Sequence, residues 1–150
     1  MLTHVRLSLL GFRFYKSSLD WHDGVIPPRP QNLWTTTQSS SKTLSYWYRP
    51  HRSSTKRPVV FMHGIGIGLL TYIPFLEQIN RLTRADDQVG IIAIELLPIS
   101  FRITHAALPK GDLCREVYAI LARHGFDSFV LASHSWVLFL SAGLGSLHTY

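Results

Sequence analysis

The sequence of 150 residues contains a single cysteine, Cys114, so it can form no disulfide bond within the chain. A disulfide framework of the kind that stabilises small secreted proteins is therefore excluded. A free cysteine is most often a small buried residue, and no metal-ligand spacing surrounds this one. We predict that Cys114 lies in the core, and we expect neither a metal ion nor a cofactor.

Acidic residues are also few. Nine Asp and Glu residues stand against 15 Lys and Arg, which gives a formal net charge of +6. The basic residues are scattered from Arg6 through Arg57 to Arg123 and form no cluster that could neutralise successive phosphates. We therefore predict no nucleic-acid partner and expect the charge to lie on a solvated surface.

Long hydrophobic runs are scarce as well. Residues 1–16 are basic and lack acids, as in a weak mitochondrial presequence or a basic segment that lies on a surface, but their apolar part is too short to span a membrane. Residues 129–147 carry no formal charge over about the length that a bilayer needs. His134 and several serines interrupt them, which favours a strand and then a buried helix. Membrane association stays an alternative, so the sequence leaves the compartment open between the cytoplasm and a membrane.

The chain changes character near residue 43. Residues 1–42 are predicted to be an irregular lead-in, because their prolines and their Ser/Thr-rich stretch leave little to bury. Residues 43–49 alternate in the period-two manner of a half-buried strand, which Pro50 closes, and they predict an edge strand. We assign residues 43–150 to a partial α/β domain.

Three apolar runs within this domain predict strands that are buried on both faces, at residues 59–62, 89–94 and 129–132. Apolar residues at helical spacing predict a helix over residues 69–82 and a second one with Asp112 as its N-cap. Strands that alternate with helices in this way predict an α/β protein with flanking helices and a mostly parallel sheet.

Candidate functional residues follow two of these predicted strands. The first strand ends in His63-Gly64-Ile65-Gly66, whose glycines let the backbone turn tightly and leave its N–H groups unobstructed. The third ends in Ser133-His134-Ser135-Trp136, a strand, sharp turn and helix that would project the Ser135 hydroxyl from the end of the sheet. Because ligands bind at the carboxyl ends of parallel strands, we expect both segments to line one crevice.

In this order and spacing, the two segments resemble the α/β-hydrolase superfamily over about residues 43–136. More narrowly, the chain is similar to fungal hydrolase-like proteins with an AB hydrolase-1 domain. The resemblance implies the N-terminal part of an α/β-hydrolase fold and a serine hydrolase that cleaves ester or other acyl bonds of a small molecule, with Ser135 as nucleophile. It also implies an oxyanion hole made by the backbone N–H groups of Trp136 and Ile65, with Gly66 as the alternative donor.

The sequence departs from the family pattern near and beyond the predicted nucleophile. Val137 stands where the family has a glycine, no Asp or Glu follows Asp127, and His148 is the only histidine after the turn. Neither His134 nor Glu95 is expected to replace the missing acid and base. We therefore expect a chain that is incomplete or inactive, truncated after the nucleophile turn. The alternatives are a non-catalytic hydrolase-like fragment and a membrane-associated protein with an apolar C-terminal segment.

Overall fold

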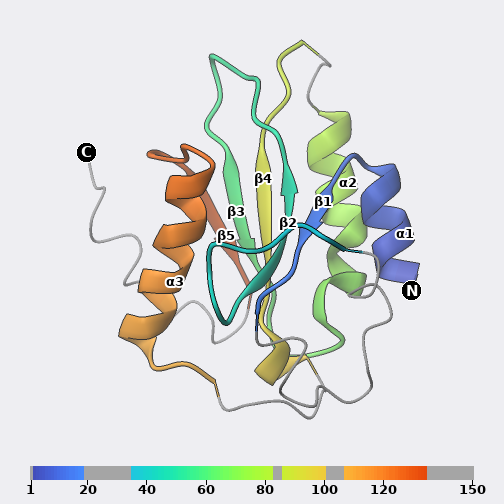
Figure 1. The fold of residues 1–150 in the computed structure, drawn as a ribbon. Helices are drawn as coiled ribbons and strands as arrows, with labels where there is room; N and C mark the ends of the chain where they lie inside the picture. Colours follow the sequence, from blue (N-terminus) through green and yellow to red (C-terminus); the bar gives the residue numbers. More distant parts are fainter. Residues whose placement is uncertain (1, 19–34, 83–85, 101–106, 135–150) are drawn as a thin grey trace.

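The computed structural model describes residues 2–18, 35–82, 86–100 and 107–134, which form a sheet between two layers of helices (Figure 1). Its strands are β1 (Arg13–Tyr15), β2 (Ser45–Arg49), β3 (Val59–Met62), β4 (Ile91–Glu95) and β5 (Val130–Ser133). Its helices are α1 (Leu2–Leu9), α2 (Ile73–Arg81), α3 (Lys110–Arg123) and the short 3₁₀ helices η3 (Gly68–Tyr72) and η4 (Leu97–Ile99). Helix α3 covers one face of the sheet, and α1 and α2 cover the other.

The sheet is mixed, and the structure does not show the mostly parallel sheet that the sequence predicts. Its order is β1-β2-β4-β3-β5, in which β3 runs parallel to β4 and β5 whereas β2 runs antiparallel to β1 and β4. Alternation along residues 43–49 predicts a strand, but it carries no information on the direction of that strand. Nor is β2 an edge strand, because β1 pairs along its outer side, with Phe14 opposite Trp47.

Two elements lie within residues 1–42, which are predicted to be irregular. Helix α1 packs against β1, η3 and α2, and β1 forms one edge of the sheet. A helix of eight residues and a strand of three are too short to give a clear apolar period, which explains why the sequence pattern missed them.

The core has two parts because alternate residues of each strand face opposite layers. Toward α3 the strands turn a set of large aromatic and aliphatic side chains, Tyr46, Val60, Met62, Ile92 and Ile94. Toward α1 and α2 they turn Trp47, Phe61, Ile91 and Ala93. The predicted buried strands at 59–62 and 89–94 are thus found as β3 and β4, and β4 is fully buried from Ile91 to Ile94.

The two predicted helices are present with shifted boundaries. Residues 69–82 form η3 and then α2, and the second helix begins at Lys110 with Pro109 as its N-cap. Asp112 is therefore not the cap. It lies in the first helical turn, where a carboxylate interacts favourably with the helix dipole, and it pairs with Arg115. Cys114 is half-buried and packs against the core beneath α3, as predicted.

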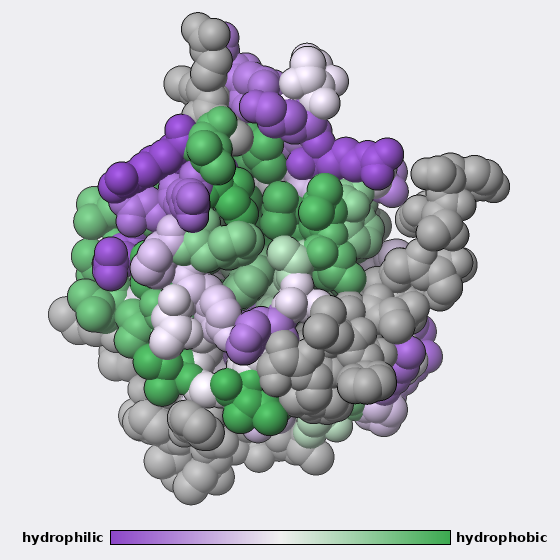
Figure 2. Space-filling model, turned by 180° about the vertical axis from the view of Figure 1, so that it is seen from behind, coloured by the Kyte–Doolittle hydropathy of each residue, from purple (hydrophilic) through white to green (hydrophobic). Residues whose placement is uncertain are grey.

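Strand β5 is less buried than its apolar sequence predicts. Val130 is half exposed, and Leu131 to Ser133 are only partly buried. Burial of a strand depends on its neighbours, and within the described residues only β3 pairs with β5. Strand β5 lies at the back of the sheet in Figure 1, and the reverse view in Figure 2 shows apolar side chains gathered in the middle of that side.

The end of α3 is fixed to β2 by an aromatic cluster. The His124 ring stacks on Tyr48 with centroids 3.7 Å apart, and the Tyr46 hydroxyl and His124 Nε2 form a hydrogen bond of 2.9 Å. Burial, assisted by the nearby Arg123 guanidinium, lowers the pKa of His124 to about 4. Burial also raises the pKa of Tyr46. The folded protein thus keeps both side chains neutral across the neutral and mildly acidic range.

His124 is expected to make the fold less stable as the pH falls from about 6.5 to about 4. The unfolded chain takes up a proton on this imidazole near its ordinary pKa of about 6.5, whereas the folded chain does so only near pH 4. After allowance for partial solvent exposure, the loss is about 2 kcal/mol. Urea denaturation of the wild type and of His124→Gln at several pH values measures it. The Gln variant retains an acceptor for Tyr46, so an equally steep pH dependence in that variant would exclude His124 as the cause.

Candidate active site at the carboxyl ends of β3 and β5

Strands β3 and β5 end side by side. Met62 is the register partner of Ser133, and the His134 N–H donates to the Met62 carbonyl oxygen at 3.2 Å. The segment that starts at His63 therefore lies next to the end of β5, as the sheet argument predicts. Ser135 follows directly in the sequence, but it lies outside the described residues.

Trp136, the other predicted site residue after β5, also lies outside the described residues. So do Val137 and His148, at which the sequence departs from the family pattern. The roles of Ser135 as nucleophile and of Trp136 as oxyanion donor stay predictions. The same holds for the apolar C-terminal segment. No helix within the described ranges is long and apolar enough to cross a membrane.

His63 connects the ends of β3 and β4. Its side chain is fully buried, Nδ1–H donates to the Gly64 carbonyl oxygen at 2.8 Å, and Nε2 accepts from the Leu96 N–H at 2.9 Å. Burial lowers its pKa, against smaller opposing effects of the Gly64 carbonyl and the Glu95 carboxylate. The ring is therefore neutral and has both nitrogens occupied. His63 holds the loop in place and is not available as a base.

A second hydrogen bond fixes the same loop. The Gly66 N–H donates to the Ile99 carbonyl oxygen at 3.0 Å, and the Gly66 φ of 152° is one that favours glycine. An amide that is used in this way is not available to an oxyanion. Ile65 is exposed, and its N–H makes no hydrogen bond with the described residues. The role of Ile65 as an oxyanion donor stays a prediction.

His134 is held on the face of the sheet that α2 covers. Its Nδ1 makes a hydrogen bond of 2.9 Å with the Tyr72 hydroxyl, and the two ring centroids lie 5.7 Å apart. The sequence pattern does not predict this contact, because Tyr72 fits the apolar face of the predicted helix. The only feature of the sequence that indicates the contact is a tyrosine, with its hydroxyl, a few residues after the glycine-rich segment that follows β3.

Glu95 also takes part in a structural contact. It lies at the end of β4, and its Oε1 accepts from Trp47 Nε1 at 2.9 Å. This carboxylate thus joins β4 to β2.

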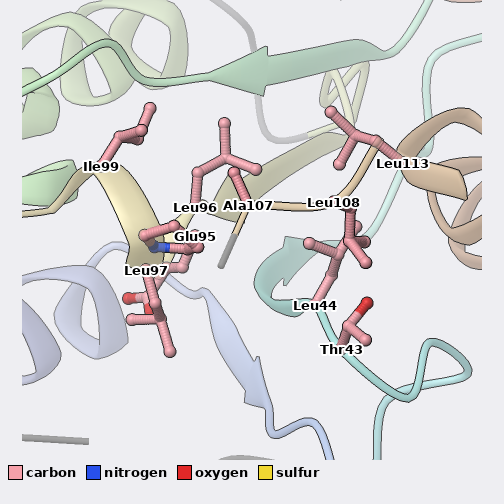
Figure 3. Close-up of a pocket in the computed structure, with 10 residues that line it drawn as sticks. Thr43, Leu44, Glu95, Leu96, Leu97, Ile99, Ala107, Leu108 and Leu113 are labelled. Carbon is pink, nitrogen blue, oxygen red and sulfur yellow. The ribbon is translucent and has the colours of Figure 1, made fainter. Parts of the chain in front are cut away.

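A small cavity of about 30 Å³ lies beside the end of β4 (Figure 3). Its walls are aliphatic apart from two side chains, and they are Thr43, Leu44, Glu95, Leu96, Leu97, Pro98, Ile99, Ala107, Leu108 and Leu113. Among the described residues, no three His, Cys, Asp or Glu side chains are grouped to hold a metal ion.

The fold is an α/β fold with a mixed five-stranded sheet. No protein-family model matches the chain, and no curated protein matches it. Among solved structures, it is similar to a membrane phospholipase A described as a novel bacterial virulence factor, at 15% identity and a TM-score of 0.48. That match covers 89% of this chain and 35% of the phospholipase chain, so the chain spans about a third of that protein's length.

A hydrolase is thus a distant structural neighbour of this chain. The likeness is too remote to carry an argument about activity. The narrower resemblance to fungal AB hydrolase-1 proteins finds no support in these comparisons.

Proposed function

We propose that the chain carries the nucleophile and part of the oxyanion hole of a serine hydrolase of the α/β-hydrolase type, which acts on ester or other acyl bonds of a small molecule. The observation that carries the proposal is the adjacency of β3 and β5. Ile65 lies three residues after Met62, and Ser135 lies two residues after Ser133, the register partner of Met62. Over so few residues the chain cannot separate the two positions widely.

The connections of the sheet support the same location. Strand β3 leads to β4 through α2 on one face, whereas β4 leads to β5 through α3 on the other face. The chain therefore turns back after β4 and passes β3 to reach β5, which puts the topological switch point between β3 and β5. Ligands of open α/β sheets bind outside the carboxyl ends of the strands at such a point. The strand order, with β2 antiparallel to its neighbours, also supports a sheet of the α/β-hydrolase type.

The proposed chemistry is nucleophilic attack on an acyl carbonyl. The Ser135 hydroxyl would attack the carbonyl carbon, and the Ile65 and Trp136 N–H groups would stabilise the charge that develops on the carbonyl oxygen. A serine hydroxyl needs a base for this step. In the described ranges, His63 has both ring nitrogens occupied and His134 is hydrogen-bonded to Tyr72.

These hydrogen bonds of the two histidines favour a second candidate function, a hydrolase-like protein without catalytic activity. Glu95 is bonded to Trp47, and the sequence has no Asp or Glu after Asp127. An attack by Ser135 without an oriented histidine and acid would be slow. The two candidates differ in one observable, which is whether Ser135 reacts covalently.

Reaction of the folded chain with a fluorophosphonate probe tests the proposal. We expect the wild type and Ser133→Ala to be labelled and Ser135→Ala to fall to background, because the proposal assigns the nucleophile to Ser135 alone. Ser133→Ala is the matched control, since it removes a hydroxyl at the end of β5. Equal labelling of Ser135→Ala would overturn the assignment. Absence of labelling in folded wild type would assign the chain to the non-catalytic class.

A further inference from the structure

Helix α1 carries apolar side chains on the face that is turned away from the protein. Leu2, Val5 and Leu9 are 61%, 47% and 83% exposed, and their spacing of three and four residues places them in one stripe. Leu7 is fully buried in the core on the other side of the helix. A surface helix normally turns polar residues to the solvent. This apolar stripe therefore calls for an explanation.

Positive charge accompanies the stripe. Arg6 is exposed and adjoins Val5 in the sequence, Arg13 is exposed just beyond the helix, and the described residues 2–18 contain no Asp or Glu. The whole chain has a formal charge of +6. Exposed apolar side chains can enter an apolar layer, and the cationic side chains beside them are attracted to negative charge at its surface. An anionic lipid bilayer has that composition.

Two further exposed apolar side chains lie in the loop before η3. Ile65 and Ile67 are more than half exposed, and they precede η3, against which α1 packs. Figure 1 shows α1 at the outside of its helix layer, so its outer face is not covered by another described element. The two isoleucines belong to the loop that follows β3, where the candidate active site lies.

We propose that α1 is an interfacial helix that binds reversibly to anionic lipid surfaces. Leu2, Val5 and Leu9 would enter the boundary between headgroups and acyl chains, while Arg6 would contact lipid phosphates. A helix of two turns buries little area, so the binding is weak and depends on the charge of the lipid. The proposal does not depend on Ser135, because the lipid contacts need no chemical step.

Vesicle co-sedimentation of the full chain tests this binding. We expect the wild type to bind phosphatidylcholine vesicles that contain phosphatidylglycerol at least about tenfold more tightly than pure phosphatidylcholine vesicles, and to lose binding as salt is added. The double variant V5Q/L9Q should weaken binding by about tenfold or more, because two inserted apolar side chains are removed. Arg6→Gln should weaken it by about fivefold and reduce its salt dependence.

Leu82→Gln is the matched control. Leu82 is 73% exposed at the end of α2 and lies outside the stripe, so its replacement should leave vesicle binding unchanged. All the substituted residues are exposed, and thermal denaturation followed by circular dichroism verifies that each variant is folded. Equal binding of V5Q/L9Q and wild type, or no binding of wild type to anionic vesicles, would overturn the proposal.

Two further outcomes are decisive. If the wild type is a dimer that V5Q/L9Q converts to a monomer and neither binds vesicles, the stripe is a protein interface and the lipid proposal is wrong. Ser135→Ala should bind vesicles as the wild type does. A failure of vesicle binding is thereby distinguished from a failure of the proposed hydrolase, which the fluorophosphonate probe reports separately.

Discussion

Gly90→Ala is expected to lower the free energy of unfolding by about 3 kcal/mol and the Tm by on the order of 10 °C. A Cβ atom at Gly90 would lie 2.4 Å from His51 Cβ and 2.8 Å from His51 Cα. Two carbon atoms at such separations repel strongly. Since one of the atoms belongs to the main chain, the clash cannot be relieved by a side-chain rotation alone.

Hydrogen bonds hold both sides of this contact in place. The Gly90 N–H donates to His51 Nδ1 at 2.9 Å, and the Gly90 carbonyl oxygen accepts from the Val59 N–H at 2.8 Å. Arg52, which follows His51 in the sequence, donates its N–H to the Gln88 carbonyl oxygen at 2.8 Å. Relief of the clash would break or lengthen some of these bonds, which explains the size of the expected effect.

Gly111→Ala provides the matched control for Gly90→Ala. Gly111 lies in the first turn of α3, and the nearest atom to a Cβ there is Arg115 Nη1 at 4.0 Å. Alanine has the higher helix propensity, so this variant should be more stable than the wild type by about 0.5 kcal/mol. Urea denaturation followed by circular dichroism measures both variants. Equal stability of the Gly90→Ala variant and the wild type would show that residues 51 and 90 are not in close contact.

Gly90 also shows which features of the fold local sequence patterns do not predict. The apolar run at residues 89–94 predicts β4 well, because burial on both faces leaves a local signature in the residue types. The need for glycine at position 90 arises from His51, which is 39 residues earlier in the chain. No local pattern predicts that contact, because it depends on how distant segments pack.

The same distinction explains the errors in the predicted fold. The helical faces of α2 and α3 and the strands β3 and β4 follow from local periodicity and are confirmed. The antiparallel direction of β2 and the partial exposure of β5 depend on which strands become neighbours. Periodicity shows which face of a segment is buried and does not show what lies beside it.

At the candidate site, the sequence predicts where the loop after β3 lies but not the hydrogen bonds that its residues make. Glycines after an apolar run predict a tight loop at the end of β3, and the structure has such a loop there. The occupation of both His63 ring nitrogens depends on Leu96, which follows a different strand. The hydrogen bond of Gly66 depends likewise on Ile99. Because of these long-range hydrogen bonds, Gly66 and His63 both hold the loop in place.

Trp47→Ala is expected to lower the free energy of unfolding by about 4 kcal/mol, since it leaves a large cavity in a closed core. Trp47 is 1% exposed, and its ring centroid lies 4.9 Å from that of His4 and 5.0 Å from that of Phe14. It therefore packs β2 against β1 and α1. The substitution also removes the indole N–H that donates to Glu95 Oε1 at 2.9 Å.

Trp47→Phe separates the two contributions. Phenylalanine retains an aromatic ring in the same layer but cannot donate to Glu95, so we expect a loss of about 2 kcal/mol. Urea denaturation followed by far-ultraviolet circular dichroism is the appropriate measurement, because both variants lose one of the four tryptophans and their intrinsic fluorescence is no longer comparable with that of the wild type. A loss as large for Phe as for Ala would assign the effect to the hydrogen bond with Glu95. A loss below about 1 kcal/mol for Ala would mean that α1 and β1 are not packed on Trp47 as described, because truncation of a buried tryptophan normally costs several times more.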